Sequence, residues 1–186
     1  MTHLGLVIPG GPFFLSAVLR IPAVALQQRG ADVRDVPLSQ GFNMSGSLDD
    51  NRDYFDGVGQ QIQEIISERD WSQVTFVAKS VGTMILGAIG ARLSVPGSVN
   101  ALWLTPTFPL DYVRDGAVAT GWRSLIVSGS ADHWYHAART TEVVEALGAD
   151  HLLIDGAEHN LEIAGDVGAT LGALEQLATA TLSFVK

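Results

Sequence analysis

The chain has 186 residues, of which 47% are hydrophobic and 17% charged, a composition typical of globular proteins and unlike that of disordered ones. It is long enough to bury a sizeable core, and we expect residues 1–186 to form a single domain. The net charge of −9, without any cluster of Lys and Arg, argues against nucleic acid as a partner.

Cysteine is absent, which excludes disulfides, thiolate metal sites and a cysteine nucleophile. The first residues contain no basic segment, and their apolar run stops at residues 9–11, Pro-Gly-Gly, so no signal peptide is expected. No apolar run reaches the length of about 18 residues that a membrane span needs. These features predict a cytoplasmic protein without a membrane span.

Short apolar segments alternate with amphipathic ones along the chain. Apolar runs bounded by Gly or Pro are typical of strands buried on both faces, and apolar residues three or four positions apart are typical of helices. The first helix contains Pro22, and we expect its regular part to start near that residue, because proline is tolerated only in a first turn or at a break. In chain order, the predicted elements are strand 4–8, helix 15–29, strand 31–36, helix 49–69, strand 74–78, helix 81–93, strand 99–104, strand 125–128, helix 135–147, strand 151–154 and helix 161–184.

This order of elements predicts an α/β fold. Strands that alternate with helices form a parallel sheet covered on both faces, here a three-layer sandwich of about six strands. Ligands of such sheets bind at the carboxyl ends of the strands. Functional residues are therefore expected in the loops that follow the strands.

The segment after the third strand has the pattern of a nucleophile elbow. Residues 78–82 read Ala-Lys-Ser-Val-Gly, close to the usual Gly-x-Ser-x-Gly. Ala78 replaces the first glycine, and we expect the turn to accept its methyl group. Ser80 is the candidate nucleophile, and the alternative is an ordinary N-cap of the helix that follows.

Two other strand-end loops supply the groups that a serine nucleophile needs. A serine hydroxyl is a poor nucleophile at neutral pH, and His159, after the sixth strand, is a natural base for it. Asp132, after the fifth strand, would orient the imidazole and stabilise its charged form. Asp111 is the rival acid, and we favour Asp132 because it follows its strand at once. The alternatives are an N-cap role for Asp132 and a surface position for His159.

The other histidines do not have the spacing of a metal site. His133 and His136 lie three residues apart, unlike two ligands separated by a full helical turn, and they are interpreted as surface or cavity residues. The glycines at residues 10–11 lack the neighbours of a phosphate-binding loop or a dinucleotide site. We therefore expect neither a metal nor a cofactor.

Four motifs together resemble the α/β-hydrolase superfamily, in the short, lidless form of bacterial serine hydrolases near the dienelactone-hydrolase-like enzymes. They are Pro-Gly-Gly at residues 9–11, the elbow at 78–82, Gly-Ser-Ala-Asp at 129–132 and Gly-x-x-His-x-Leu at 156–161. Serine, acid and histidine also follow one another in this superfamily's order. The resemblance spans nearly the whole chain and implies a minimal fold without a cap domain.

The resemblance also implies the rest of the site. The backbone N–H groups of Gly11 and Val81 are expected to form an oxyanion hole, which stabilises a developing alkoxide. Aromatic side chains in or beside the strand-end loops are candidates for lining an acyl pocket: Phe13, Phe14, Phe108 and Trp134.

The leading hypothesis is a serine hydrolase of the carboxylesterase or thioesterase class, which cleaves an ester, thioester or similar acyl bond through an acyl-enzyme. It would act on a small-molecule acyl substrate. The alternatives are an acyltransferase with the same triad and a binding protein that keeps the fold without catalysis, because many unrelated activities share this fold. The oligomeric state, monomer or homodimer, stays open.

Overall fold

A parallel sheet is the centre of the fold in the computed structural model, which describes residues 2–11, 16–44 and 46–185. Within these residues the sheet has six strands, in the order β2-β1-β3-β4-β5-β6. Their bounds are β1 His3–Ile8, β2 Asp32–Asp35, β3 Gln73–Lys79, β4 Ser98–Leu104, β5 Arg123–Gly129 and β6 Asp150–Ile154. All neighbouring strands pair in parallel, so their carboxyl ends meet at one edge.

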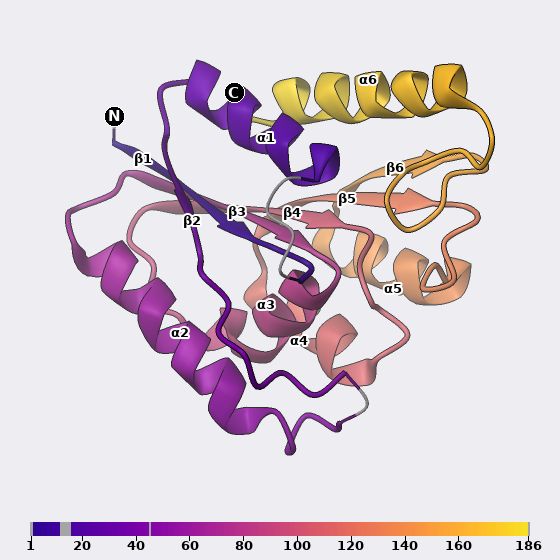
Figure 1. Cartoon of the computed structure of the whole chain (residues 1–186). Helices are drawn as coiled ribbons and strands as arrows, with labels where there is room; N and C mark the ends of the chain where they lie inside the picture. The colour runs from indigo at the N-terminus through magenta and orange to yellow at the C-terminus, as the bar shows by residue number, and fades with distance from the viewer. Residues whose placement is uncertain (1, 12–15, 45, 186) are drawn as a thin grey trace.

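Helices cover both faces of the sheet (Figure 1). On one face, α1 (Ala17–Gln28) and α6 (Val167–Phe184) lie side by side. The other face carries α2 Arg52–Ser67, α3 Val81–Ile89, the 3-10 helix η1 Gly90–Arg92, α4 Asp111–Thr120 and α5 Ala137–Leu147. The predicted three-layer α/β sandwich is confirmed. Only residues 105–110 connect β4 to α4, which leaves no room for a cap domain there.

Each face of the sheet has its own hydrophobic core. Successive strand residues point to opposite faces. In β3, Phe76 and Ala78 therefore pack with the helices α2 to α5, whereas Val77 packs with α1 and α6. Strands buried on both faces have continuous apolar sequences. This explains why the sequence pattern locates the four central strands, β1, β3, β4 and β5, whereas the edge strands β2 and β6 are less buried. All six predicted strands agree with the structure to within two residues at each end.

The prediction that the regular part of the first helix starts near Pro22 is wrong. α1 begins at Ala17, and Pro22 lies inside the helix rather than near its start. A proline in a helix interior removes one backbone hydrogen bond. Here Pro22 belongs to a buried apolar face with Val18 and Leu19, and burial of that face offsets the lost bond.

One helix is missing from the sequence prediction, and the start of another differs from it. The pattern contains no helix between the fourth and fifth strands, where α4 lies, because only Val113 and Ala117 of α4 are buried. α6 begins at Val167 rather than near residue 161. Its N-cap is Asp166, whose carboxylate accepts a hydrogen bond from the Ala169 N–H at 2.9 Å.

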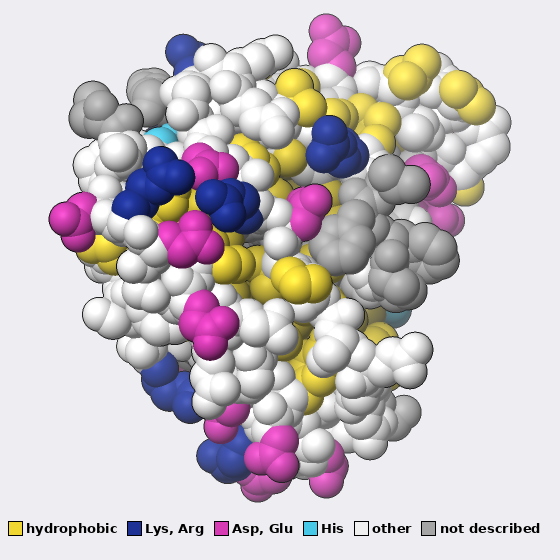
Figure 2. Space-filling view, turned by 60° about the vertical axis from the view of Figure 1, so that its left-hand side comes forward, with side chains coloured by type: hydrophobic (Ala, Val, Ile, Leu, Met, Phe, Trp, Pro, Cys, Tyr) yellow, Lys and Arg dark blue, Asp and Glu magenta, His cyan; other side chains and the backbone are white. Residues whose placement is uncertain are grey.

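Charged side chains flank the β2 edge of the sheet. Asp32 pairs with Arg34 at 2.8 Å and with Arg69 at 3.3 Å. Figure 2 shows basic and acidic side chains close together on one face of the molecule. Charges at an edge strand discourage pairing with another chain.

Within the part of the chain that the structure describes, no helix combines the length and hydrophobicity that crossing a membrane requires.

Candidate active site

Ser80 lies between the last residue of β3 and the first residue of α3. Its backbone has φ 51° and ψ −114°, a conformation that residues other than glycine adopt rarely and at a cost in strain. Its N–H donates to the Leu104 carbonyl at 3.1 Å, and its carbonyl accepts from the Thr83 N–H at 2.8 Å. The strained turn is therefore held from both sides, as a nucleophile elbow requires.

Close backbone contacts explain the small residues around this turn. A Cβ on Gly82 would lie 2.3 Å from the Ile8 carbonyl oxygen, so only glycine fits. A Cβ on Gly10 would lie 2.8 Å from the Cβ of Ser80, which places the loop after β1 directly against the elbow. Ala78 is fully buried in the core, so the turn accommodates a methyl group where the usual pattern has glycine.

Ser80, His159 and Asp132 form a chain of contacts at the carboxyl ends of β3, β5 and β6. The Ser80 Oγ lies 2.8 Å from His159 Nε2, and His159 Nδ1 lies 2.9 Å from Asp132 Oδ2. With the proton on Nδ1, the imidazole donates to the carboxylate and accepts from the serine hydroxyl. The Ser80 hydroxyl makes no capping bond to α3, so this side chain is not an ordinary N-cap.

The carboxylate of Asp132 is almost fully buried, with 2% of its side chain exposed. Burial raises the pKa of Asp132, but the hydrogen bonds from His159 and from the Trp134 N–H, at 2.9 Å, outweigh it and hold that pKa below its usual value. The carboxylate therefore stays charged at neutral pH. It does not cap α5, whose N-cap is His136.

Asp111, the rival acid, lies away from the histidine. It opens α4, and 70% of its side chain is exposed. Its carboxylate pairs with Arg114 at 2.8 Å and with Arg139 at 3.7 Å. The structure thus brings Asp132, and not Asp111, to His159.

A cavity of about 290 Å³ opens in front of the serine. Ser80 and His159 line it, and so do Gly11 and Val81, the residues expected to form the oxyanion hole. Gly11 has φ +147°, a conformation that favours glycine. Trp134, one of the aromatic candidates for an acyl pocket, also lines this cavity.

Phe108 is not among the residues that line this cavity. It is 1% exposed, and its ring packs 6.0 Å from that of Trp103 in the core below the sheet. Its place in the loop after β4 suggested a pocket position, but the loop turns this side chain inward. The other two aromatic candidates, Phe13 and Phe14, lie outside the described residues.

Solved structures show the same architecture. A serine hydrolase homologue from Coxiella burnetii matches at a TM-score of 0.64 with 17% identity, over 96% of this chain and 84% of that one. A lidless α/β serine hydrolase from Xanthomonas campestris matches at a TM-score of 0.63 with 16% identity, over 98% of this chain and 80% of that one. The chain has the α/β-hydrolase fold.

A third match is Est1E from Butyrivibrio proteoclasticus, in a structure with ferulic acid bound. Its TM-score is 0.68 at 10% identity, over 100% of this chain and 90% of that one. No protein-family model matches the chain, and no curated protein matches it in sequence. At these identities the likeness establishes the fold, and the chemistry is argued from the site itself.

Lys79 also lines the cavity in front of Ser80, although the sequence pattern gives it no role in the site. The residue is only 6% exposed. Burial lowers the pKa of its ammonium group, and the negative charges of Asp132 and Glu162 oppose this only in part. The signal in the sequence is a lysine at the end of a largely apolar, buried strand.

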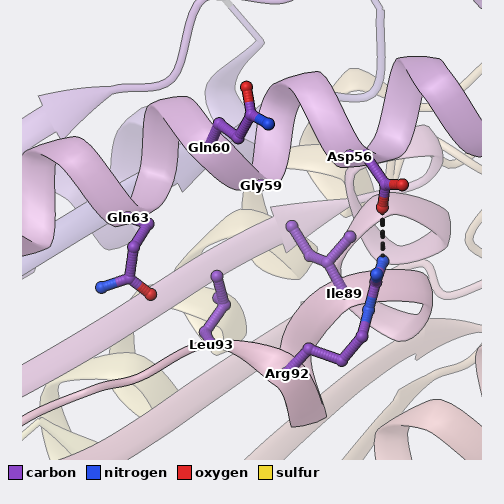
Figure 3. Close-up of a pocket in the computed structure, with 7 residues that line it drawn as sticks. All are labelled: Asp56, Gly59, Gln60, Gln63, Ile89, Arg92 and Leu93. Carbon is purple, nitrogen blue, oxygen red and sulfur yellow. Dashed lines mark hydrogen bonds and ion pairs between the residues drawn. The ribbon is translucent and has the colours of Figure 1, made fainter.

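A separate hollow of about 310 Å³ lies between α2 and η1, away from the elbow (Figure 3). Arg92 and Asp56 form an ion pair at 2.8 Å across it. None of its labelled residues is a candidate nucleophile or base. Over the described residues, no three His, Asp or Glu side chains gather in a way that could hold a metal ion.

Proposed function

We propose that this protein is a serine hydrolase that cleaves a carboxylic ester, thioester or related acyl bond through an acyl-enzyme. The observation that carries the proposal is the chain of contacts from Ser80 through His159 to Asp132, at 2.8 and 2.9 Å. The likeness to a solved serine hydrolase homologue and to a lidless serine hydrolase supports this class of reaction.

In the first half of the reaction, Ser80 Oγ attacks the carbonyl carbon while its proton passes to His159 Nε2. The carbonyl oxygen becomes an oxyanion, which accepts hydrogen bonds from the N–H groups of Gly11 and Val81. Asp132 holds the imidazole in place and stabilises its positive charge. His159 then protonates the leaving alcohol or thiol, the bond to it breaks, and the acyl group stays on Ser80.

In the second half, a water molecule replaces the leaving group. His159 removes a proton from the water as its oxygen attacks the acyl carbon. The second tetrahedral intermediate uses the same two N–H donors. His159 returns the proton to Ser80 Oγ as the carboxylic acid departs, so the free enzyme is restored without any cofactor.

The substitution Ser80→Ala tests the nucleophile. The variant should lose labelling by a fluorophosphonate probe, and its kcat on p-nitrophenyl acetate should fall by on the order of 10⁴- to 10⁶-fold. The matched control is Ser98→Ala. Ser98 is the first residue of β4, at the end of the strand away from the site, so this variant should be labelled and active like the wild type. Circular dichroism should show the same fold in all three proteins.

Other outcomes of this experiment would change the assignment. Clear labelling of Ser80→Ala would mean that another residue is the nucleophile. A wild-type protein that reacts with neither the probe nor the ester would favour a binding protein. Products formed with added alcohols or thiols, in place of the free acid, would identify an acyltransferase.

A further inference from the structure

A second, larger cavity adjoins the cavity in front of Ser80. Its volume is about 500 Å³, compared with about 290 Å³ for the first. Both are lined by Gly10, Gly11, Met44 and Val81, so they lie next to each other beside the expected oxyanion donors. His159 lines only the first cavity. The second cavity therefore extends from the expected oxyanion donors on the side away from His159.

The wall of the second cavity is mostly apolar, although the polar residues Ser39 and Gln40 also line it. The loop between β2 and α2 supplies Leu38 and Phe42, and α2 supplies Tyr54. The rings of Phe42 and Tyr54 lie 5.5 Å apart, and Phe42 also packs 5.9 Å from the core residue Phe55. Of the described residues that line this cavity, none is charged. Its size is within the range of about 300–1,000 Å³ that is typical of ligand sites.

The proposed reaction fixes which part of a substrate lies on which side. The leaving group must be close to His159, which protonates it, so it lies in the first cavity with His133 and Trp134. The carbonyl oxygen must point to the N–H groups of Gly11 and Val81. The remaining substituent of the carbonyl carbon is the acyl chain, and the space left for it is the second cavity.

We propose that the second cavity is the acyl-binding site and that the protein prefers esters of uncharged, apolar acids longer than acetic acid. This inference rests on the proposed function. Each methylene buried there should raise kcat/KM about fourfold, because a buried methylene group contributes about that factor to binding. A charged acyl chain has no partner on this wall and would lose its hydration.

Two substrate series separate the two cavities. The p-nitrophenyl esters of acetic, butyric and hexanoic acid vary the acyl group, and acetates of different phenols and alcohols vary the leaving group. Wild-type kcat/KM should rise along the acyl series. Tyr54→Ala should flatten this rise and leave the leaving-group series unchanged, whereas Trp134→Ala should do the opposite.

Two further variants strengthen the test. Ser39→Trp, at an exposed position on the wall of the second cavity, fills the space and should reduce the rate for hexanoate more than that for acetate. It keeps the test decisive if Tyr54→Ala fails to fold. Leu171→Ala, on the exposed face of α6, is the matched control and should leave both series unchanged.

The outcomes distinguish this inference from the proposed function. An active wild type with a flat acyl series, or a leaving-group series altered by Tyr54→Ala or Ser39→Trp, would overturn the acyl site and leave the hydrolase assignment standing. A wild type inert toward both series and toward the fluorophosphonate probe would overturn both. A rising acyl series that Tyr54→Ala or Ser39→Trp suppresses supports the acyl site.

Discussion

At the scale of single residues, Asp132 differs from the other acidic residues near the strand ends in what its two oxygens accept. One accepts from His159 and the other from the Trp134 N–H, both at 2.9 Å. Two bonds on a buried carboxylate fix both its charge and its orientation. The imidazole is fixed in turn, with Nε2 directed at Ser80.

The substitution Asp132→Asn tests this orienting role. We expect kcat to fall by on the order of 10⁴-fold, because an amide neither stabilises the imidazolium nor selects the correct tautomer. Asp111→Asn is the matched control, since its side chain is exposed and pairs with Arg114, and its kcat should equal that of the wild type. Steady-state hydrolysis of p-nitrophenyl butyrate measures both. A loss confined to Asp111→Asn would make Asp111 the acid.

Sequence reasoning reaches these residues because each one lies at the start of, or within, the loop that follows a strand. The strands are recognisable as apolar runs, and parallel pairing then brings their carboxyl ends together without any knowledge of side-chain contacts. The second cavity could not be predicted in this way. Leu38 and Phe42 lie in a loop without periodicity, and only the packing of Phe42 against Tyr54 and Phe55 makes that loop a wall.

At the scale of elements, the helix that carries the elbow is positioned by a contact between glycines. A Cβ on Gly116 of α4 would lie 1.8 Å from the Gly87 carbonyl oxygen of α3. A Cβ on Gly87 would lie 2.7 Å from the Cα of Val113. The two helices therefore touch through their backbones. α4 is missing from the sequence prediction because its buried stripe is only Val113 and Ala117, so its role in supporting α3 is visible only in the structure.

The substitution Gly116→Ala tests this contact. The added methyl group must push α4 away from α3, and we expect a loss of about 2 kcal/mol in the free energy of unfolding. Gly172→Ala in α6 is the matched control, because no atom lies within 4 Å of its added Cβ. Alanine favours a helix, so that variant should gain up to about 1 kcal/mol. Urea unfolding, with an unchanged m-value, measures the free energy of unfolding of both variants. If the two substitutions changed it equally, the close contact between α3 and α4 would be disproved.

At the scale of the whole molecule, the buried ammonium group of Lys79 makes the free energy of unfolding depend on pH. Burial lowers its pKa in the folded chain below the value of about 10.4 that lysine has when unfolded. Between these two pKa values the unfolded chain binds more protons, so stability rises with pH. At any pH below the pKa of Lys79 in the folded chain, the side chain is charged in both states, so the free energy of unfolding is reduced by the full cost of burying the charge.

The substitution Lys79→Met should therefore raise the Tm near neutral pH, because the apolar side chain fills the site without a charge. The gain should shrink as pH rises toward about 10, where the unfolded lysine also loses its proton. Thermal unfolding followed by circular dichroism over this pH range measures the difference. Arg20→Met, on the exposed face of α1, is the control and should show no such trend. A gain that grows with pH would contradict the burial argument.

The separations along the chain within the proposed triad have a consequence for folding kinetics. Ser80 and His159 are 79 residues apart, and Asp132 and His159 are 27 residues apart. Contacts between distant parts of a chain form slowly, because loops must close before they can be made. The triad exists only once β3, β5 and β6 lie in register. During refolding, fluorophosphonate reactivity should therefore never return before the sheet does, which makes the nucleophile a reporter of completed folding.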